Sequence, residues 1–221
     1  VLLIFAMVLC FSASFSISSL SFCEDELISF IENSGIRTAG SEGEKQSASY
    51  IQKKLEELNI SPLYEEYQQS FEYNDSTSQN VLGIVDNGSD KYVVIGAHYD
   101  NIYKLDQSEG VNDNASGVIT SLNLAGNFAT KNLDFNIIFA YFGAEEVGLV
   151  GSEYFLNNLT NEILDNIILY INLDSIGAGD NLYYYHYDAP TTYGTFVDSF
   201  AENYAITKLG TKRLYSNRNS L

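Results

Sequence analysis

Residues 92–97 read YVVIGA, a short apolar run that is followed at once by His98. Residues 135–142 (FNIIFAYF) and residues 167–173 (IILYINL) are two further runs of this kind, and all three are rich in β-branched and aromatic side chains. Such runs are typical of strands that are covered on both faces, which occur in sheets that are mainly parallel. They therefore predict a mostly parallel sheet at the centre of the domain.

Helices are expected before and between these strands. Residues 41–44 (SEGE) match the capping box Ser-x-x-Glu, which opens a helix. The apolar residues that follow recur at steps of three and four and share one helix face: Ala48, Ile51, Leu55 and Leu58. The other predicted helices cover residues 24–33, 116–129, 149–159 and 193–204. Because strands alternate with helices, the pattern favours one α/β domain with helices on both sides of the sheet.

The stretch between the first helices and YVVIGA is predicted to contain two more strands. They lie near residues 61–72 and 80–85. Polar residues rich in Asn and Ser separate them, so that residues 73–79 and 86–91 are expected to be loops.

The composition excludes several functions. The chain has 221 residues, and 11 basic against 29 acidic side chains give a net charge of −18. Such a charge argues against a protein that binds the phosphate backbone of nucleic acid, and it disfavours adsorption to anionic membranes. Cys10 and Cys23 are too few for a disulfide scaffold or a cysteine zinc cluster. Because His98 and His186 are the only histidines, metal or acid–base chemistry must rely mainly on carboxylates.

Residues 1–23 carry no charge and read as an apolar segment followed by a Ser-rich tail. This pattern predicts a secretory signal peptide with cleavage after Ser21, and hence a secreted protein that is free of the membrane. A retained N-terminal anchor with the domain facing outward is the alternative. Since an initiator Met and a basic segment are missing, we expect the sequence to begin inside its own signal. Residues 24–221 then form the domain.

Polar side chains follow each of the three buried strands. The first run is followed by His98, the second by Glu145 and Glu146 after a Gly-Ala step, and the third by Asp174. A fourth segment, GVNDNASG at residues 110–117, precedes a predicted helix and contributes Asp113. Ligands bind beyond the carboxyl ends of parallel strands, so these side chains are expected at one rim of the sheet.

Each of these residues alone has an ordinary structural explanation, but together they indicate a metal site. Clustered carboxylates would repel one another by several kcal/mol in a partly desolvated site, and divalent cations remove that cost. Histidine and carboxylate are nitrogen and oxygen ligands that zinc accepts. Asp113, flanked by glycines, is the natural carboxylate to bridge two ions. Asp100 is placed to accept the second ring N–H of His98.

The adjacent Glu145 and Glu146 are predicted to divide two roles. Their side chains leave an extended or turning backbone in different directions, so one can bind metal while the other acts as general base on a bound water.

Four ordered motifs resemble those of a known family. The motifs are HYD (residues 98–100), GVNDNASG (110–117), FGAEEVGLVGS (142–152) and NLDSIG (172–177). They look like the zinc-dependent exopeptidases of the aminopeptidase Y and bacterial leucyl aminopeptidase type, metallopeptidase family twenty-eight. RTAGS at residues 37–41 also resembles that family's entry to the domain. The resemblance implies a three-layer α/β sandwich with a mixed, mostly parallel sheet, as in the phosphorylase/hydrolase-like fold.

The resemblance also implies a site and an activity. His98, Asp113 and Asp174 would hold one zinc, Asp113 and Glu146 the other, and Glu145 would be the general base. The expected function is that of a secreted aminopeptidase which hydrolyses N-terminal residues from peptides.

One expected ligand is missing. The family supplies a second zinc-binding histidine well beyond the position of Asp174, whereas the only later histidine here is His186. We interpret His186 as a strand residue rather than a ligand, and we expect the chain to be truncated at its C-terminal end. Three alternatives remain open: a single-zinc glutaminyl cyclase, a carboxypeptidase of the same family, and a non-catalytic ectodomain of the transferrin receptor kind.

Overall fold

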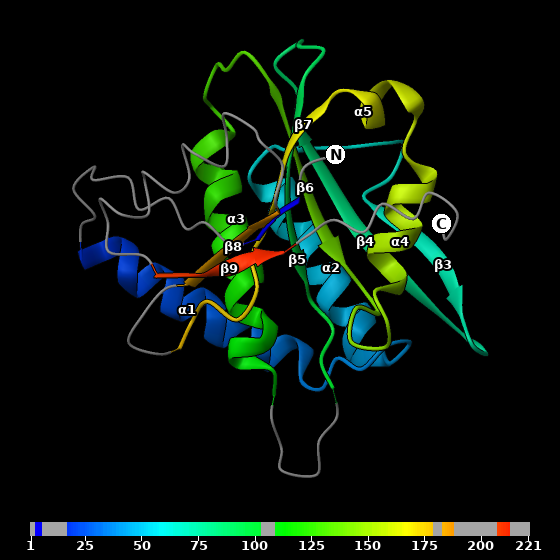
Figure 1. Ribbon diagram of the computed structural model, residues 1–221. Coiled ribbons are helices and arrows are strands. Elements are labelled where there is room, and N and C mark those ends of the chain that lie inside the picture. Colours follow the sequence, from blue (N-terminus) through cyan, green and yellow to red (C-terminus); the bar gives the residue numbers. More distant parts are fainter. Residues whose placement is uncertain (1–2, 6–16, 103–108, 179–182, 188–206, 213–221) are drawn as a thin grey trace.

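The computed structural model describes residues 3–5, 17–102, 109–178, 183–187 and 207–212. Within these residues nine strands form one mixed sheet in the order β2-β4-β6-β5-β7-β1-β8-β9, with β3 paired to β4 (Figure 1). The strands are β1 (Leu3–Phe5), β2 (Ser61–Pro62), β3 (Gln68–Tyr73), β4 (Ser76–Val85), β5 (Tyr92–His98), β6 (Asn136–Phe142), β7 (Ile167–Asn172), β8 (Tyr183–Tyr187) and β9 (Thr207–Lys212). The helices are α1 (Ile17–Ser34), α2 (Glu42–Glu57), α3 (Ser116–Phe128), α4 (Val150–Asn158) and α5 (Asn161–Asp165), and a short helical turn η1 (Val111–Ala115) precedes α3.

Three neighbouring strands position the candidate site. β5 lies between β6 and β7 and pairs in parallel with both. In this register His98, the last residue of β5, lies opposite Phe142, the last residue of β6. Asp174 follows two residues after the end of β7. The carboxyl ends of the three predicted strands therefore meet at one edge of the sheet.

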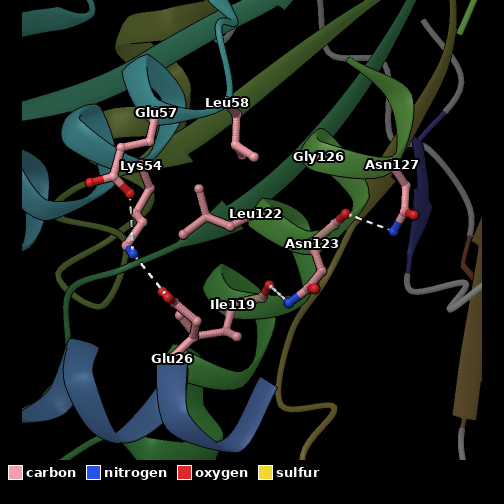
Figure 2. Close-up of a pocket in the computed structure, with 9 residues that line it drawn as sticks. All are labelled: Glu26, Lys54, Glu57, Leu58, Ile119, Leu122, Asn123, Gly126 and Asn127. Carbon is pink, nitrogen blue, oxygen red and sulfur yellow. Dashed lines mark hydrogen bonds and ion pairs between the residues drawn. The ribbon is translucent and has the colours of Figure 1, made fainter. Parts of the chain in front are cut away.

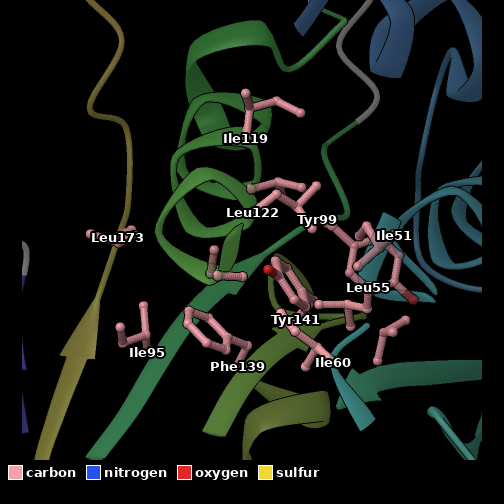
Figure 3. Packing of buried hydrophobic residues seen from close by; sticks show 14 of the residues in the cluster. Ile51, Leu55, Ile60, Ile95, Tyr99, Ile119, Leu122, Phe139, Tyr141 and Leu173 are labelled. Carbon is pink, nitrogen blue, oxygen red and sulfur yellow. The ribbon is translucent and has the colours of Figure 1, made fainter. Parts of the chain in front are cut away.

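Helices cover both faces of the sheet, which makes the molecule a three-layer sandwich (Figure 1). On one face α1, α2 and α3 pack against β4, β5 and β6. Figure 3 shows the central residues of this core, among them Ile51, Leu55, Ile95, Ile119, Leu122, Phe139 and Tyr141. On the opposite face Phe155 of α4 packs against Val94, Ile138 and Phe142. The predicted α/β class with a mixed sheet is confirmed.

The prediction of a loop over residues 73–79 is wrong for most of its length. β3 and β4 form an antiparallel hairpin in which Tyr73 pairs with Ser76, so that only two residues make the turn. Ser78 and Gln79 are buried in β4, where Ser78 donates to Glu44 and Gln79 donates to Tyr99. Their polarity reflects buried hydrogen bonds to distant partners rather than exposure at a turn.

The N-terminal part differs in length from the expected helix. α1 confirms the helix predicted for residues 24–33 but begins at Ile17, before the predicted cleavage position. β1, which falls inside the predicted signal peptide, pairs with β7 and β8. The signal peptide stays a prediction. No helix within the described part of the chain is long and apolar enough to cross a membrane.

Two further expectations concern the C-terminal third. The backbone of His186 belongs to β8, as its interpretation as a strand residue requires. The helix predicted for residues 193–204 lies outside the described residues.

Candidate metal centre

Three segments bring His98, Asp113 and Asp174 together at the carboxyl edge of the sheet. His98 ends β5, Asp113 lies in η1, and Asp174 follows β7. His98 Nε2 lies 3.1 Å from Asp113 Oδ1 and 3.7 Å from Asp174 Oδ1. One potential ligand atom from each residue lies within 4.8 Å of those of the other two. These three residues form the ligand triad.

The triad combines a buried imidazole with open carboxylates. His98 is 3% exposed, whereas the side chains of Asp113 and Asp174 are 57% and 37% exposed. Burial lowers the pKa of His98, but the carboxylates of Asp100, Asp113 and Asp174 outweigh burial and raise this pKa to about 12. The His98 proton thus offsets part of the negative charge, and a divalent cation bound to the neutral ring would take over this role.

Asp100 has more contacts than the sequence predicts. Its Oδ1 accepts a hydrogen bond from the Glu145 N–H (3.0 Å), and its Oδ2 accepts one from the Glu146 N–H (3.1 Å). Asp100 Oδ1 lies 3.6 Å from His98 Nδ1, while the backbone carbonyl oxygen of Asp100 lies closer to that ring nitrogen, at 3.2 Å. Asp100 therefore holds both the imidazole and the turn after β6.

That turn places the two glutamates differently. Glu145 Oε2 lies 3.9 Å from His98 Nδ1. Burial, together with nearby carboxylates, raises the pKa of Glu145, although His98 acts in the opposite direction. The Glu146 carboxylate does not belong to the ligand triad, but burial and the charge of Asp113 raise its pKa as well. The structure thus brings Glu145 next to the triad. It places Glu146 near enough to Asp113 for the Asp113 charge to raise the pKa of Glu146.

Asn114 links the two aspartates of the triad. The peptide bond between Asp113 and Asn114 is cis, and the Asn114 side chain is fully buried. Its Nδ2 donates to the Leu173 carbonyl (2.9 Å), and its Oδ1 accepts from the Ser175 N–H (3.1 Å). These bonds hold the residues on both sides of Asp174, so that one amide side chain sets the separation of two potential ligands.

Arg37 supports the same region, in a role that sequence reasoning did not assign. The guanidinium is fully buried and donates to the carbonyls of Tyr99 (2.7 Å), Glu109 (2.8 Å) and Gly110 (2.9 Å). Burial lowers the pKa of Arg37 to about 10, although nearby carboxylates, Asp100 first among them, raise it. Arg37 therefore joins the segment after β5 to the start of the segment that carries Asp113.

Glu44 is the second residue whose role the sequence did not reveal. Its N–H donates to Ser41 Oγ (3.2 Å), which is one half of the predicted capping box. The Glu44 carboxylate instead accepts from the N–H groups of Gly40 (2.7 Å) and Ala144 (3.0 Å). One signal was available, because Glu44 lies four residues before Ala48 and so on the apolar face of α2. A carboxylate on the buried face of a helix needs a specific partner.

The residues of the triad fit a zinc ion. A histidine nitrogen and two carboxylate oxygens are accepted zinc ligands, and three protein ligands are the usual number in catalytic zinc sites. The two open carboxylates leave the site accessible from solvent, while buried Asp100 orients the ring.

One pocket in the described part of the chain lies away from the triad. It has a volume of about 310 Å³ and lies between α1, α2 and α3 (Figure 2). Lys54 contributes to its wall and forms ion pairs with Glu26 (2.9 Å) and Glu57 (3.4 Å). None of the predicted metal ligands lines this pocket. The metal centre is instead an open rim above the sheet.

A buried histidine with open carboxylates, at the carboxyl edge of a three-layer α/β sandwich, defines a class of metal-dependent domains. The family model for Peptidase family M28 matches residues 80–217, which are more than half of the chain. The chain therefore belongs to Peptidase family M28, and the predicted family is confirmed.

Individual relatives show how far the likeness reaches. Leupeptin-inactivating enzyme 1 of Streptomyces exfoliatus is 32% identical over 176 residues, which cover 76% of this chain and 38% of that protein. A zinc aminopeptidase from Bacillus subtilis has a similar structure, with a TM-score of 0.69, 18% identity, and coverage of 86% of this chain and 79% of that chain. A glutaminyl cyclase from Bacteroides thetaiotaomicron has a TM-score of 0.64 and 17% identity, with coverage of 90% and 78%.

The two solved structures, at less than 20% identity, show the fold alone. The chain spans 38% of the length of the Streptomyces relative.

Proposed function

We propose that the protein is a zinc aminopeptidase that removes N-terminal residues from peptides. The observation that carries this proposal is the ligand triad with Glu145 beside it, 3.9 Å from the same imidazole. Membership of Peptidase family M28 supports peptide-bond hydrolysis, and the fold is shared with a zinc aminopeptidase.

The residues would divide the work as follows. His98, Asp113 and Asp174 would hold one zinc ion, and Asp113 with Glu146 would contribute to a second. Bound zinc would supply Lewis-acid polarisation of the scissile carbonyl. Glu145 would take a proton from the attacking water and pass it to the leaving amine, because its raised pKa favours temporary storage of a proton. Asp100 would keep His98 and both glutamates oriented.

The test is an activity assay that separates metal binding from catalysis. The protein is expressed with all residues that its gene encodes and assayed on aminoacyl anilides and short peptides. Removal of metal by a chelator should abolish release of the N-terminal residue, and added zinc should restore it. Glu145→Gln should keep its zinc but lower kcat by about 10²- to 10⁴-fold, because glutamine cannot accept the proton.

The control is Glu153→Gln, which changes an exposed glutamate in α4 and should keep wild-type turnover. Wild-type turnover by Glu145→Gln would refute the role of Glu145. A protein that binds zinc but neither cleaves a peptide nor releases ammonia from N-terminal glutamine would point to the non-catalytic alternative.

A glutaminyl cyclase is the second candidate. The observation that favours it is that the described side chains gather three ligands, the number that a single zinc ion needs. The two functions differ in zinc content and in product. An aminopeptidase should bind two zinc ions and release the first residue of a peptide with N-terminal glutamine. A cyclase should bind one and release ammonia from it.

We further propose that the protein is exported. The uncharged segment of residues 1–23 supports this proposal. Sequencing of the N-terminus of the native protein should begin at Phe22. An intact leader in the mature protein would favour the membrane-anchored alternative.

A further inference from the structure

Three consecutive backbone N–H groups of the turn after β6 point to two buried carboxylates. The N–H groups of Glu145 and Glu146 donate to Asp100, and the N–H of Ala144 donates to Glu44 Oε1 (3.0 Å). Asp100 lies two residues after His98, the β5 residue of the triad, whereas Glu44 comes from α2 and is 100 residues away from its partner in sequence.

The conformation of Ala144 explains why this partner matters. Ala144 adopts the left-handed backbone region, with φ at 52°, which is costly for a residue with a Cβ. Strain of this kind persists where the surroundings hold the backbone in place. Ala144 is the residue at which the chain turns from β6 toward Glu145, and its N–H donates the hydrogen bond to Glu44.

Glu44 itself is held on all sides. It is fully buried, Ser78 Oγ donates to Oε1 (2.8 Å), and the Gly40 N–H donates to Oε2 (2.7 Å). Gly143 lies so close that a Cβ at this position would be 2.8 Å from Glu44 Oε1. The carboxylate therefore has little freedom to move. Because it accepts the Ala144 N–H, it also restricts the motion of the turn.

We propose that Glu44 is a positioning residue for Glu145: it fixes the turn from below through Ala144 and thereby sets where the Glu145 carboxylate lies relative to the triad. This inference rests on the proposed function, in which Glu145 is the general base. A misplacement of about 1 Å costs up to about 100-fold in rate, so the effect should appear in kcat. Glu44 is fully buried and does not belong to the triad, so KM and zinc content should change little.

Two substitutions at Glu44 and one matched control test this role. Glu44→Ala removes the acceptor and should lower kcat by about 10- to 100-fold. Glu44→Gln retains one acceptor oxygen, which can serve Ala144 and Ser78, and should restore most of kcat. Ser41→Ala removes the N-cap of the same helix without touching Ala144 and should destabilise α2 at unchanged kcat.

A second readout does not depend on peptidase activity. Amide hydrogen exchange in a peptide that covers residues 143–147 should be faster in Glu44→Ala than in the wild type and in Ser41→Ala. Equal exchange and equal kcat in the wild type and Glu44→Ala would overturn the proposal. So would losses of kcat in Ser41→Ala that match those in Glu44→Ala at equal stability.

The two proposals fail in different ways. If the wild type cleaves no peptide, the proposed function fails, while hydrogen exchange still decides whether Glu44 holds the turn. If the wild type is active and Glu145→Gln is not, but Glu44→Ala behaves as wild type in both readouts, only the positioning role is wrong.

Discussion

The turn after β6 and the segment before α3 both carry acidic side chains to the metal centre, but they are anchored by opposite charges. The turn after β6 presents N–H groups, and the carboxylates of Glu44 and Asp100 accept from them. The segment before α3 presents carbonyls, and Arg37 donates to those of Glu109 and Gly110.

The cationic anchor Arg37 and the anionic anchor Glu44 come from one short stretch of sequence. Arg37 lies just before α2 and Glu44 lies in its first turn, seven residues later. Each anchor is fully buried, and each carries the charge that complements the backbone groups it binds. The stretch of residues 37–44 therefore connects two halves of the metal centre, although none of its side chains belongs to the triad.

The largest effect is expected when the cationic anchor is removed. Arg37→Met removes the donors to the carbonyls of Tyr99 and Glu109, while the Gly110 carbonyl keeps the Ala115 N–H as a donor. It should lower the free energy of unfolding by about 3–5 kcal/mol. Urea unfolding measures this change. The same variant should bind zinc more weakly, because Asp113 lies three residues beyond Gly110.

Two controls separate charge from geometry. Lys131→Met changes an exposed cation and should leave the free energy of unfolding nearly unchanged. Arg37→Lys retains the charge but lacks the planar fork, so it should restore only part of the loss. Complete restoration by lysine would show that the charge alone is sufficient.

The anionic anchor should respond to pH. Burial, first of all, raises the pKa of Glu44 from 4.5 to about 7, although hydrogen bonds from Gly40, Ser78 and Ala144 lower it. The charge of Asp100 also raises it, and Tyr99 faces the same region. Because the folded state keeps a proton that the unfolded state loses, stability falls as the pH rises from about 4.5 to about 7.

Glu44→Gln cannot ionise and should remove this decline. The pKa change corresponds to about 3 kcal/mol between the two pH values. Urea unfolding of chelator-treated protein across this range should therefore show a decline that is smaller by about this amount than in the wild type. Glu42→Gln, which changes an exposed carboxylate in the same helix turn, should follow the wild-type profile. A parallel decline in Glu44→Gln and wild type would contradict the titration of Glu44.

The elements that the sequence predicts well are those with local signals. The apolar runs predict β5, β6 and β7 nearly to the residue, and the capping box with apolar spacing predicts α2. The positions of His98 and Asp174 at strand ends follow from the same local rule, and their role as ligands stays a prediction. The structure indeed places both in the triad with Asp113.

The missed features depend on contacts between distant residues. Ser78 looks like a loop residue because its partner, Glu44, lies 34 positions earlier. Glu44 looks like a capping residue because the local motif is complete, whereas its bond to Ala144 spans 100 positions. The position of Glu44 on the apolar face of α2 indicates that it needs a partner, but local rules do not reveal which distant residue that partner is.

The smallest effect is expected at a link between the segment before α3 and the residues after Asp174. Ser116 Oγ donates to the Asn112 carbonyl (2.6 Å) and accepts from the Ile176 N–H (3.1 Å). Ser116→Ala removes both bonds and should cost about 1 kcal/mol of unfolding free energy. Because the link joins segments that each carry an aspartate of the triad, zinc affinity should also fall, by less than about tenfold.

Ser152→Ala is the control. It removes a single local hydrogen bond to the Leu149 carbonyl, beyond the turn after β6, and should leave zinc affinity unchanged. Equal zinc affinity in both variants, measured by competition with a chromophoric chelator, would show that Arg37 and Asn114 hold this segment without Ser116.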